Sequence, residues 1–452
     1  MSQLREHWSS RIGFIMAAAG SAIGLGILWK FPYTVGQNGG GLFILAYLAC
    51  VLFVGIPLFI AEIVLGRRTQ LSAVGAFTGE KVSPNWKAVG WVAVLSSFLI
   101  MSYYSVIAGW GMSYVVMSLT GVFKGVSADR VSAIFDEMSS SAFITIFWHA
   151  LFTLITMGIV VCGVRKGIEY WSKIMMKILL VLLLGLFFYS LSLEGFGKAF
   201  YFVFYPDVAH FHPTSLLEAL GLAFFTLSLG QGIMITYGSY MKKSEDIPKT
   251  GLIIGSMLIV VALLAALSIF PVVFTFGFPS SCGSGLVFKT LPYLFEQLPA
   301  SIILSAVFFA LFVFCALTSA VPLIEVVAAN LIDMYKWSRR RATLVVGAST
   351  FIVGIPSCLS NTPYLAHWKD IYGFDFLGTM DHLVCVWLLP IGGWFTALFV
   401  GWYTDKNILW KEFIEGTKWR FLWQGWLFFI RYLVPVAVLL IVLEKSGLFP
   451  CL

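Results

Sequence analysis

Two short segments rich in glycine and hydroxyl side chains carry the groups in this sequence that are best suited to hold a small charged ligand. They read Gly20-Ser-Ala-Ile-Gly-Leu-Gly26 and Thr226-Leu-Ser-Leu-Gly-Gln-Gly232, and each interrupts an otherwise apolar run. A helix that unwinds at such a segment exposes N–H groups at the positive end of a helix dipole, which suit a carboxylate, and frees carbonyl oxygens, which suit a small cation. One break can therefore hold both ligands.

The two segments lie at matching positions, five apolar runs apart. Paired interruptions of this kind indicate a transporter built from inverted repeats, with the ligand bound where the helices unwind. The alternative is that the glycines only permit close packing of membrane helices, the preferred interpretation of a single G-x-x-x-G. Two such segments favour binding. We expect a single domain, 1–452, with a first repeat at about 10–193, a second at about 216–402 and an extra helix at about 419–443.

The elements that position these segments must lie in a membrane. Hydrophobic residues make up 59% of the chain and charged residues only 11%, whereas about a quarter of the residues are charged in soluble domains. Lipid cannot satisfy free backbone groups, so apolar runs of about 20 residues must cross it as helices. We predict an all-α integral membrane protein with about 11 transmembrane helices. They lie near residues 11–37, 41–66, 88–120, 142–163, 168–193, 216–240, 250–277, 300–334, 342–360, 376–402 and 419–443.

The distribution of positive charge predicts the orientation. With the amino terminus in the cytoplasm, most Lys and Arg residues fall in cytoplasmic loops, among them Arg67, Arg68 and Lys242, as the positive-inside rule requires. The net charge of +7 then follows from topology, and without a basic domain it does not indicate nucleic-acid binding. We expect a multi-pass protein of the cytoplasmic (inner) membrane with a cytoplasmic amino terminus.

Side chains that would support enzyme chemistry are not grouped along the chain. The 6 His show no H-x-x-x-H and the 7 Cys no C-x-x-C. A membrane enzyme would need a nucleophile, a metal cluster or paired acids at one depth. We therefore expect neither an enzyme nor a zinc or disulfide framework.

The residues around both segments resemble the neurotransmitter:sodium symporter family, in particular its bacterial amino-acid transporters. The resemblance begins with R-E-H-W-S-S-R-I-G-F at 5–14, includes Q-N-G-G-G at 37–41, and continues with Tyr103-Tyr104, F-F-T-L-S-L-G-Q-G at 224–232 and L-T-S at 317–319. It implies the fold of the bacterial leucine transporter and sodium-coupled import of a neutral α-amino acid, by a monomer or a homodimer. The alternatives are proton-coupled transport on the same fold and a non-transporting amino-acid receptor.

The resemblance also implies a substrate site. The carboxylate would meet the backbone at Leu25 and Gly26 and the Tyr104 hydroxyl. Gln231 stands where relatives carry an aromatic or aliphatic residue, and its amide either binds a polar substrate side chain or bonds to neighbouring backbone. The remaining residues implied to surround the substrate are Ala22, Ile100, Phe225, Thr226, Ser228, Ser319 and Leu323.

One sodium site is implied by five oxygen donors. They are the carbonyls of Gly20, Ile23 and Cys315 and the hydroxyls of Thr318 and Ser319. Such hydroxyls also often bond to the carbonyl one turn back, which is the alternative interpretation.

A second family sodium site loses two side-chain oxygens, because Ile27 and Leu258 stand where amides are expected and only Thr226 remains. A small cage without these hard ligands cannot compensate for dehydration of the ion. We predict that this site is lost and that transport uses one sodium ion.

Charged pairs at both ends of the site are implied to be gates. Lys30 and Asp381 form the outer pair, with Asp375 as the alternative partner. The inner closure comprises Arg5, Trp8, Tyr240 and Asp333.

Three further ionisable residues lie within apolar runs and are functional candidates by default. Glu62 is implied to brace the second break. Lys177 either hydrates a route to the sodium site or extends its stem to the inner headgroups. Glu325 has no assigned role.

Overall fold

The computed structural model describes residues 5–78, 82–206, 208, 211–278 and 285–445. Within these ranges the chain forms helices and no strand, apart from one isolated bridge between Gly40 and Pro206. The all-α prediction is therefore confirmed. The described cysteines are free thiols, whereas Cys282 and Cys451 lie outside the described residues.

Nine helices in the described ranges are long and apolar enough to cross a membrane, and a bent pair of helices raises the number to as many as 10. The protein is thus a multi-pass membrane protein. The predicted run at 216–240 consists of α11 (Pro213–Thr226) and α12 (Ile233–Gly238), neither long enough alone, so the total of about 11 stays a prediction. The nine are Gly41–Thr69, Pro84–Leu119, Ala142–Val161, Val164–Ser190, Ile247–Thr275, Ser301–Tyr335, Arg339–Cys358, Phe376–Tyr403 and Leu422–Lys445.

Both glycine-rich segments interrupt their helices. α1 (Arg11–Ala22) ends where Ile23 adopts φ −94° and ψ 64°, and helical structure resumes at η1 (Gly26–Lys30) with a bend of 41° between the two arms. In the second break Ser228, Gly230 and Gly232 all have positive φ. A Cβ on Gly230 would also lie 2.2 Å from the Leu389 carbonyl oxygen, so only glycine fits there.

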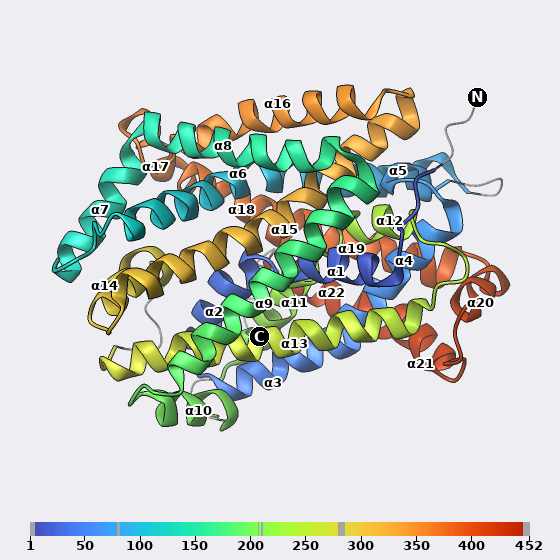
Figure 1. The fold of residues 1–452 in the computed structure, drawn as a ribbon. Coiled ribbons are helices and arrows are strands. Elements are labelled where there is room, and N and C mark those ends of the chain that lie inside the picture. Colours follow the sequence, from blue (N-terminus) through green and yellow to red (C-terminus); the bar gives the residue numbers. More distant parts are fainter. Residues whose placement is uncertain (1–4, 79–81, 207, 209–210, 279–284, 446–452) are drawn as a thin grey trace.

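The interrupted helices lie inside a bundle of long ones (Figure 1). α15 (Ser301–Tyr335) packs along α6 (Lys87–Leu119), α8 (Ala142–Val161) and α9 (Tyr170–Ser190), and α1 contacts α9, α13 (Ile247–Thr275) and α15. The short helices lie at the ends. Those at one end are α7 (Ala128–Ser140), α10 (Phe196–Phe204), α14 (Leu291–Glu296) and α17 (Trp368–Tyr372), and those at the other are α5 (Ala73–Ala76), α20 (Lys406–Ile414) and α21 (Leu422–Phe428).

The remaining helices complete the bundle and connect these ends. They are α2 (Phe31–Gln37), α3 (Gly41–Cys50), α4 (Ile56–Thr69), α16 (Arg339–Cys358), α18 (Phe376–His382), α19 (Leu389–Leu398) and α22 (Val434–Lys445). Several spans contain π-helical turns, at Val51–Gly55, Val164–Glu169, Leu383–Leu388, Phe399–Tyr403 and Phe429–Leu433.

A buried ion pair joins α4 to α20 at the end of the bundle where the N-terminal segment lies. Arg67 Nε lies 3.1 Å from Glu412 Oε2, and Arg67 Nη1 donates to the Glu245 carbonyl at 2.6 Å. Arg67 also donates to the Glu412 carbonyl, and Lys243 pairs with the same carboxylate. One guanidinium therefore ties the end of α4 to both the segment that precedes α13 and α20.

Replacing Arg67 by alanine is expected to lower thermal stability strongly. The change removes the buried cation beside Glu412 and its hydrogen bonds to the Glu245 and Glu412 carbonyls, and leaves Lys243 as the remaining partner of that carboxylate. Removing one partner of a buried pair typically costs about 3–5 kcal/mol, and we expect a loss toward the lower end of this range because Lys243 remains. The measurement is the temperature at which the detergent-solubilised protein loses its monodisperse peak. Lys411→Ala, an exposed change on the same α20, is the control and should leave that temperature unchanged. Equal behaviour of the two variants would contradict a stabilising role of the pair.

Candidate functional site

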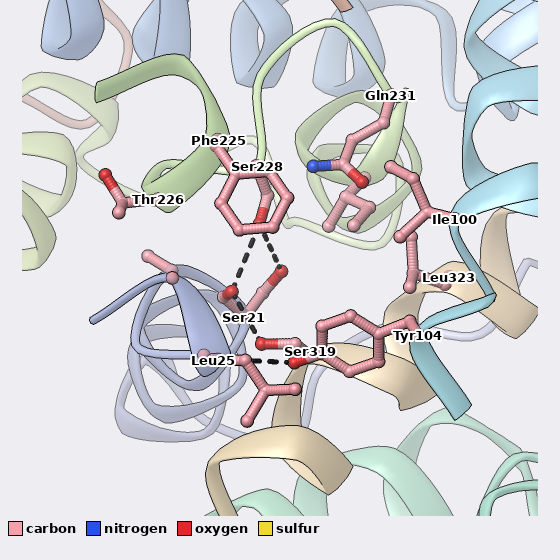
Figure 2. Close-up of a pocket in the computed structure, with 14 residues that line it drawn as sticks. Ser21, Leu25, Ile100, Tyr104, Phe225, Thr226, Ser228, Gln231, Ser319 and Leu323 are labelled. Carbon is pink, nitrogen blue, oxygen red and sulfur yellow. Dashed lines mark hydrogen bonds between the residues drawn. The ribbon is translucent and has the colours of Figure 1, made fainter. Parts of the chain in front are cut away.

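One pocket lies between the two breaks and is closed at its sides by α6 and α15 (Figure 2). Its cavity volume is about 30 Å³. The structure brings all the predicted substrate residues to this pocket: Ala22, Leu25, Gly26, Ile100, Tyr104, Phe225, Thr226, Ser228, Gln231, Ser319 and Leu323. Ser21, Gly24 and Ile233 line it too.

Sequence reasoning did not include these three among the site residues, although each was adjacent to one or within a break. Ser21 follows Gly20, and Ile233 is the first residue after the second break. Ser21 matters because its carbonyl accepts hydrogen bonds from both Ser228 at 3.1 Å and Ser319 at 3.0 Å. Residue 21 therefore links both breaks to α15.

Hydroxyl groups converge on the first break from α6 and α15. The Leu25 N–H donates to the Tyr104 hydroxyl at 3.3 Å. A Cβ on Gly24 would lie 2.1 Å from Ser319 Oγ and 3.3 Å from the Tyr104 oxygen. Glycine at 24 thus lets two hydroxyls reach the exposed backbone, where together they can donate hydrogen bonds to a carboxylate. An acidic side chain at 24 would occupy the same space.

The five predicted sodium ligands lie where α1 meets α15. Thr318 Oγ1 donates to the Cys315 carbonyl at 2.9 Å, and Ser319 Oγ lies 3.5 Å from the Gly20 carbonyl oxygen. Close approach is possible because Gly20 has no side chain: a Cβ there would lie 3.1 Å from the Thr318 Cβ. A hydroxyl that donates its hydrogen still has lone pairs for a cation. The back-bond of Thr318 therefore does not conflict with ion binding.

Two of the three residues expected at the second family sodium site have apolar side chains. Ile27 and Leu258 are fully buried, and neither side chain carries an oxygen. Thr226 Oγ1 lies 2.9 Å from the Tyr47 hydroxyl and also donates to the Leu222 carbonyl at 2.9 Å. The one remaining hydroxyl thus already has two protein partners. The loss of the second sodium site stays a prediction.

The second break is held from outside by two polar contacts. The Gly230 N–H donates to Glu62 Oε1 at 2.8 Å, and Ser97 Oγ donates to the Gln231 carbonyl at 2.6 Å. Glu62 is fully buried on α4. It therefore makes the bracing contact that the family resemblance implied, with backbone rather than with a cation.

Lys30 and Asp381 meet above the pocket. Lys30 Nζ lies 3.5 Å from Asp381 Oδ2 and 4.8 Å from the centre of the Phe225 ring, which lines the pocket. The Tyr103 hydroxyl donates to the other oxygen, Asp381 Oδ1, at 3.1 Å. The alternative partner, Asp375, instead caps α18 by accepting from the Gly378 N–H at 2.6 Å. The structure therefore pairs Lys30 with Asp381.

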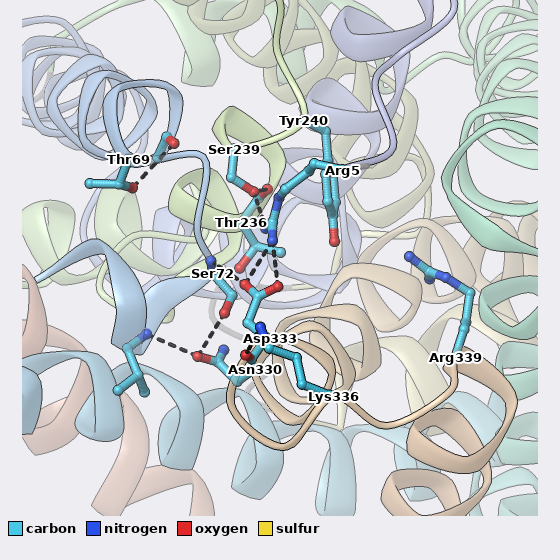
Figure 3. Close-up of polar contacts among 12 residues, drawn as sticks. Arg5, Thr69, Ser72, Thr236, Ser239, Tyr240, Asn330, Asp333, Lys336 and Arg339 are labelled. Carbon is cyan, nitrogen blue, oxygen red and sulfur yellow. Dashed lines mark hydrogen bonds and ion pairs between the residues drawn. The ribbon is translucent and has the colours of Figure 1, made fainter. Parts of the chain in front are cut away.

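Arg5 and Asp333 close the opposite end (Figure 3). Arg5 Nη1 lies 2.6 and 2.7 Å from the two Asp333 oxygens, and Arg5 Nη2 donates to Ser239 Oγ at 2.5 Å. The guanidinium lies 4.9 Å from the centre of the Tyr240 ring. Trp8 Nε1 donates to the Tyr237 carbonyl at 3.0 Å. The N-terminal segment is thus bound to both α12 and the end of α15, and both ends of the pocket are closed.

The structure supplies the partner that Glu325 lacked in the sequence. Glu325 Oε2 lies 2.8 Å from Arg339 Nη1, and the Tyr240 hydroxyl donates to Glu325 Oε1 at 2.6 Å. Glu325 therefore belongs to the closure around Arg5. Sequence reasoning missed Arg339 because an arginine in a basic loop is sufficiently explained by membrane orientation.

Lys177 lies on an exposed face of α9 and forms no ion pair with any described residue. A lysine on the outside of the bundle can extend its stem along lipid to the headgroups. Its position favours this second interpretation over hydration of the sodium route.

Comparison with known proteins places this geometry in context. The profile of the "Sodium:neurotransmitter symporter family" matches residues 5–131 and 128–446. A Bacillus subtilis protein described as the uncharacterized sodium-dependent transporter YhdH is 38% identical over 442 residues, covering 98% of both chains. A sodium- and chloride-dependent GABA transporter 2 from Bos taurus is 24% identical, covering 94% of this chain and 78% of the relative.

A solved structure has the same fold. The crystal structure of MhsT in complex with L-phenylalanine superposes with a TM-score of 0.89 at 39% sequence identity, covering 98% of this chain and 100% of MhsT.

Proposed function

Because this chain belongs to the sodium:neurotransmitter symporter family, we propose that it imports a neutral α-amino acid together with one sodium ion. The protein is a sodium-dependent membrane transporter and not an enzyme. One observation carries the finer proposal: Ser319 lines the substrate pocket and also contacts the Gly20 carbonyl of the predicted ion cage. A single side chain would therefore contact both the substrate and the sodium site.

The first break supports an amino acid as the substrate. Three polar groups converge beside Gly24, where the neighbouring atoms leave no room for a side chain. They are the Leu25 N–H, the Tyr104 hydroxyl and the Ser319 hydroxyl. Such donors suit a substrate carboxylate, and no lining residue carries a charge that would oppose it or bind a charged side chain. Carbonyl oxygens and hydroxyls at the breaks would accept from the substrate ammonium group.

The two closures support transport by alternating access. Lys30 with Asp381 and Arg5 with Asp333 block opposite ends of the pocket, and each pair joins segments that are distant in sequence. Opening one pair at a time would expose the pocket to one side of the membrane. We further propose two inverted five-helix repeats, 10–193 and 216–402, in a protein of the cytoplasmic membrane with its amino terminus inside.

Uptake into proteoliposomes tests the proposal. A panel of labelled amino acids is offered with an inward sodium gradient or an equal inward proton gradient. We expect accumulation only with sodium, and a sodium Hill coefficient close to one because Ile27 and Leu258 leave a single cage. A coefficient near two would contradict the stoichiometry. Accumulation driven by protons would contradict sodium coupling and direct attention to Glu62, and binding without accumulation would indicate a receptor.

A further inference from the structure

The side-chain amide of Gln231 lies in the pocket without a hydrogen-bond partner among the described residues. Gln231 is 4% exposed, and it uses only its backbone carbonyl, which accepts from Ser97. Its side-chain amide makes no hydrogen bond to any residue in the described part of the chain, so the interpretation in which it bonds to neighbouring backbone is not supported. Figure 2 shows this amide between Ser228 and Ile100, directed toward the interior of the pocket.

Gln231 and the groups expected to bind the substrate carboxylate lie on different elements around the pocket. The carboxylate donors Leu25 and Tyr104 lie on the first break and α6, whereas Gln231 lies in the second break. The walls near the amide are apolar, formed by Ile100 and Leu323. An amino acid held by its carboxylate at the first break would therefore extend its side chain past apolar walls toward one unpaired amide.

A buried primary amide without partners is costly, and most such groups in native proteins are satisfied. Neither polar atom of the Gln231 side chain is fully enclosed by protein, so both face the space of the pocket. A ligand with a hydrogen-bonding group would satisfy the amide, whereas a purely apolar ligand would displace water and leave it unpaired.

We propose that Gln231 hydrogen-bonds to the side chain of the transported amino acid and selects substrates whose apolar side chain ends in a neutral hydroxyl or amide. This inference rests on the proposed amino-acid transport and narrows its substrate class. The amide both donates and accepts, so it fits either group. The absence of charged residues among those that line the pocket excludes acidic and basic side chains as the preferred class.

Matched substrate pairs test the proposal in the wild-type protein. Tyrosine and phenylalanine differ by one hydroxyl, and glutamine and methionine have similar shape but only the first carries an amide. A site built to bond a substrate group rejects the analogue that lacks it by several powers of ten in favourable cases. We expect the polar member of at least one pair to be transported with a kcat/KM at least tenfold higher. Ratios within twofold in both pairs would overturn the inference.

The variant Gln231→Met tests whether the amide causes the preference. It keeps the length of the side chain and removes the amide, so the tenfold preference should fall to about one or reverse. An unchanged preference would overturn the role of Gln231. If this variant does not fold, the wild-type ratios alone decide. If sodium drives the uptake of no amino acid, both the proposed function and this inference are contradicted. If sodium drives uptake but neither substrate pair shows a preference, only this inference is contradicted.

Discussion

Replacing Thr318 by valine should weaken sodium activation of uptake by roughly 10- to 100-fold. Valine has nearly the shape of threonine but no oxygen, so the change removes one ligand from the predicted cage and little packing. A hydrogen bond to a charged group is worth about 1.5–3 kcal/mol, and we take the same range for the contact of one hydroxyl with the ion. Each 1.4 kcal/mol is about tenfold in affinity. The measurement is the sodium concentration for half-maximal uptake at a fixed, low substrate concentration.

Thr318→Ser is the matched control, because it keeps the hydroxyl and should retain a sodium dependence close to that of the wild type. Thr318 is a better test than Ser319, which also lines the substrate pocket. A Thr318→Val protein with unaltered sodium dependence would show that the ion binds elsewhere.

Replacing Arg5 by alanine should reduce uptake at least tenfold by releasing the contact with Asp333, the predicted inner gate. The guanidinium contacts both oxygens of Asp333 and the Ser239 hydroxyl, and the two charged side chains are only 16% and 15% exposed. Losing this pair leaves the Asp333 carboxylate with the Ser72 N–H at 2.8 Å and with no cation among the described residues. The population open to the inside should then rise. Sodium binding requires an assembled cage, so the apparent sodium affinity should fall by the factor by which the population with an assembled cage falls.

The measurement combines uptake with the apparent sodium affinity at equilibrium. Lys336→Ala is the control, since Lys336 lines the same recess but donates only to the Asp333 backbone carbonyl at 2.8 Å. It should leave both quantities unchanged. Normal accumulation by Arg5→Ala would show that the contact with Asp333 does not restrain the inner gate.

One residue links the Lys30–Asp381 pair to the pocket, and another links two contacts of the closure around Arg5. Phe225 lines the pocket and lies under the Lys30 ammonium group. Tyr240 contacts the Arg5 guanidinium with its ring and Glu325 with its hydroxyl. Movement of Phe225 on substrate binding would therefore alter the outer pair, and movement of α12 would break two inner contacts at once.

The overall architecture was predictable because its causes are local in sequence. Long apolar runs must be helical in lipid, and the all-α fold followed from them. The breaks were recognisable because glycines and hydroxyls cluster at 20–26 and 226–232, where the backbone indeed leaves the helical conformation at Ile23 and Ser228. Resemblance to one family then indicated which side chains surround the breaks.

Tertiary structure alone decided which polar groups are paired. The sequence contained Glu325 and Arg339 but could not show that they form an ion pair. It also could not show that the Tyr47 and Thr226 hydroxyls form a hydrogen bond. It left two uses open for the Gln231 amide, and only the packed pocket shows that no described residue forms a hydrogen bond with this amide. Composition and spacing determine where a helix can form or break. Contacts between residues separated by many helical turns depend on how the helices pack, so hydrogen-bond partners, gate pairs and substrate-facing atoms emerge only in the folded chain.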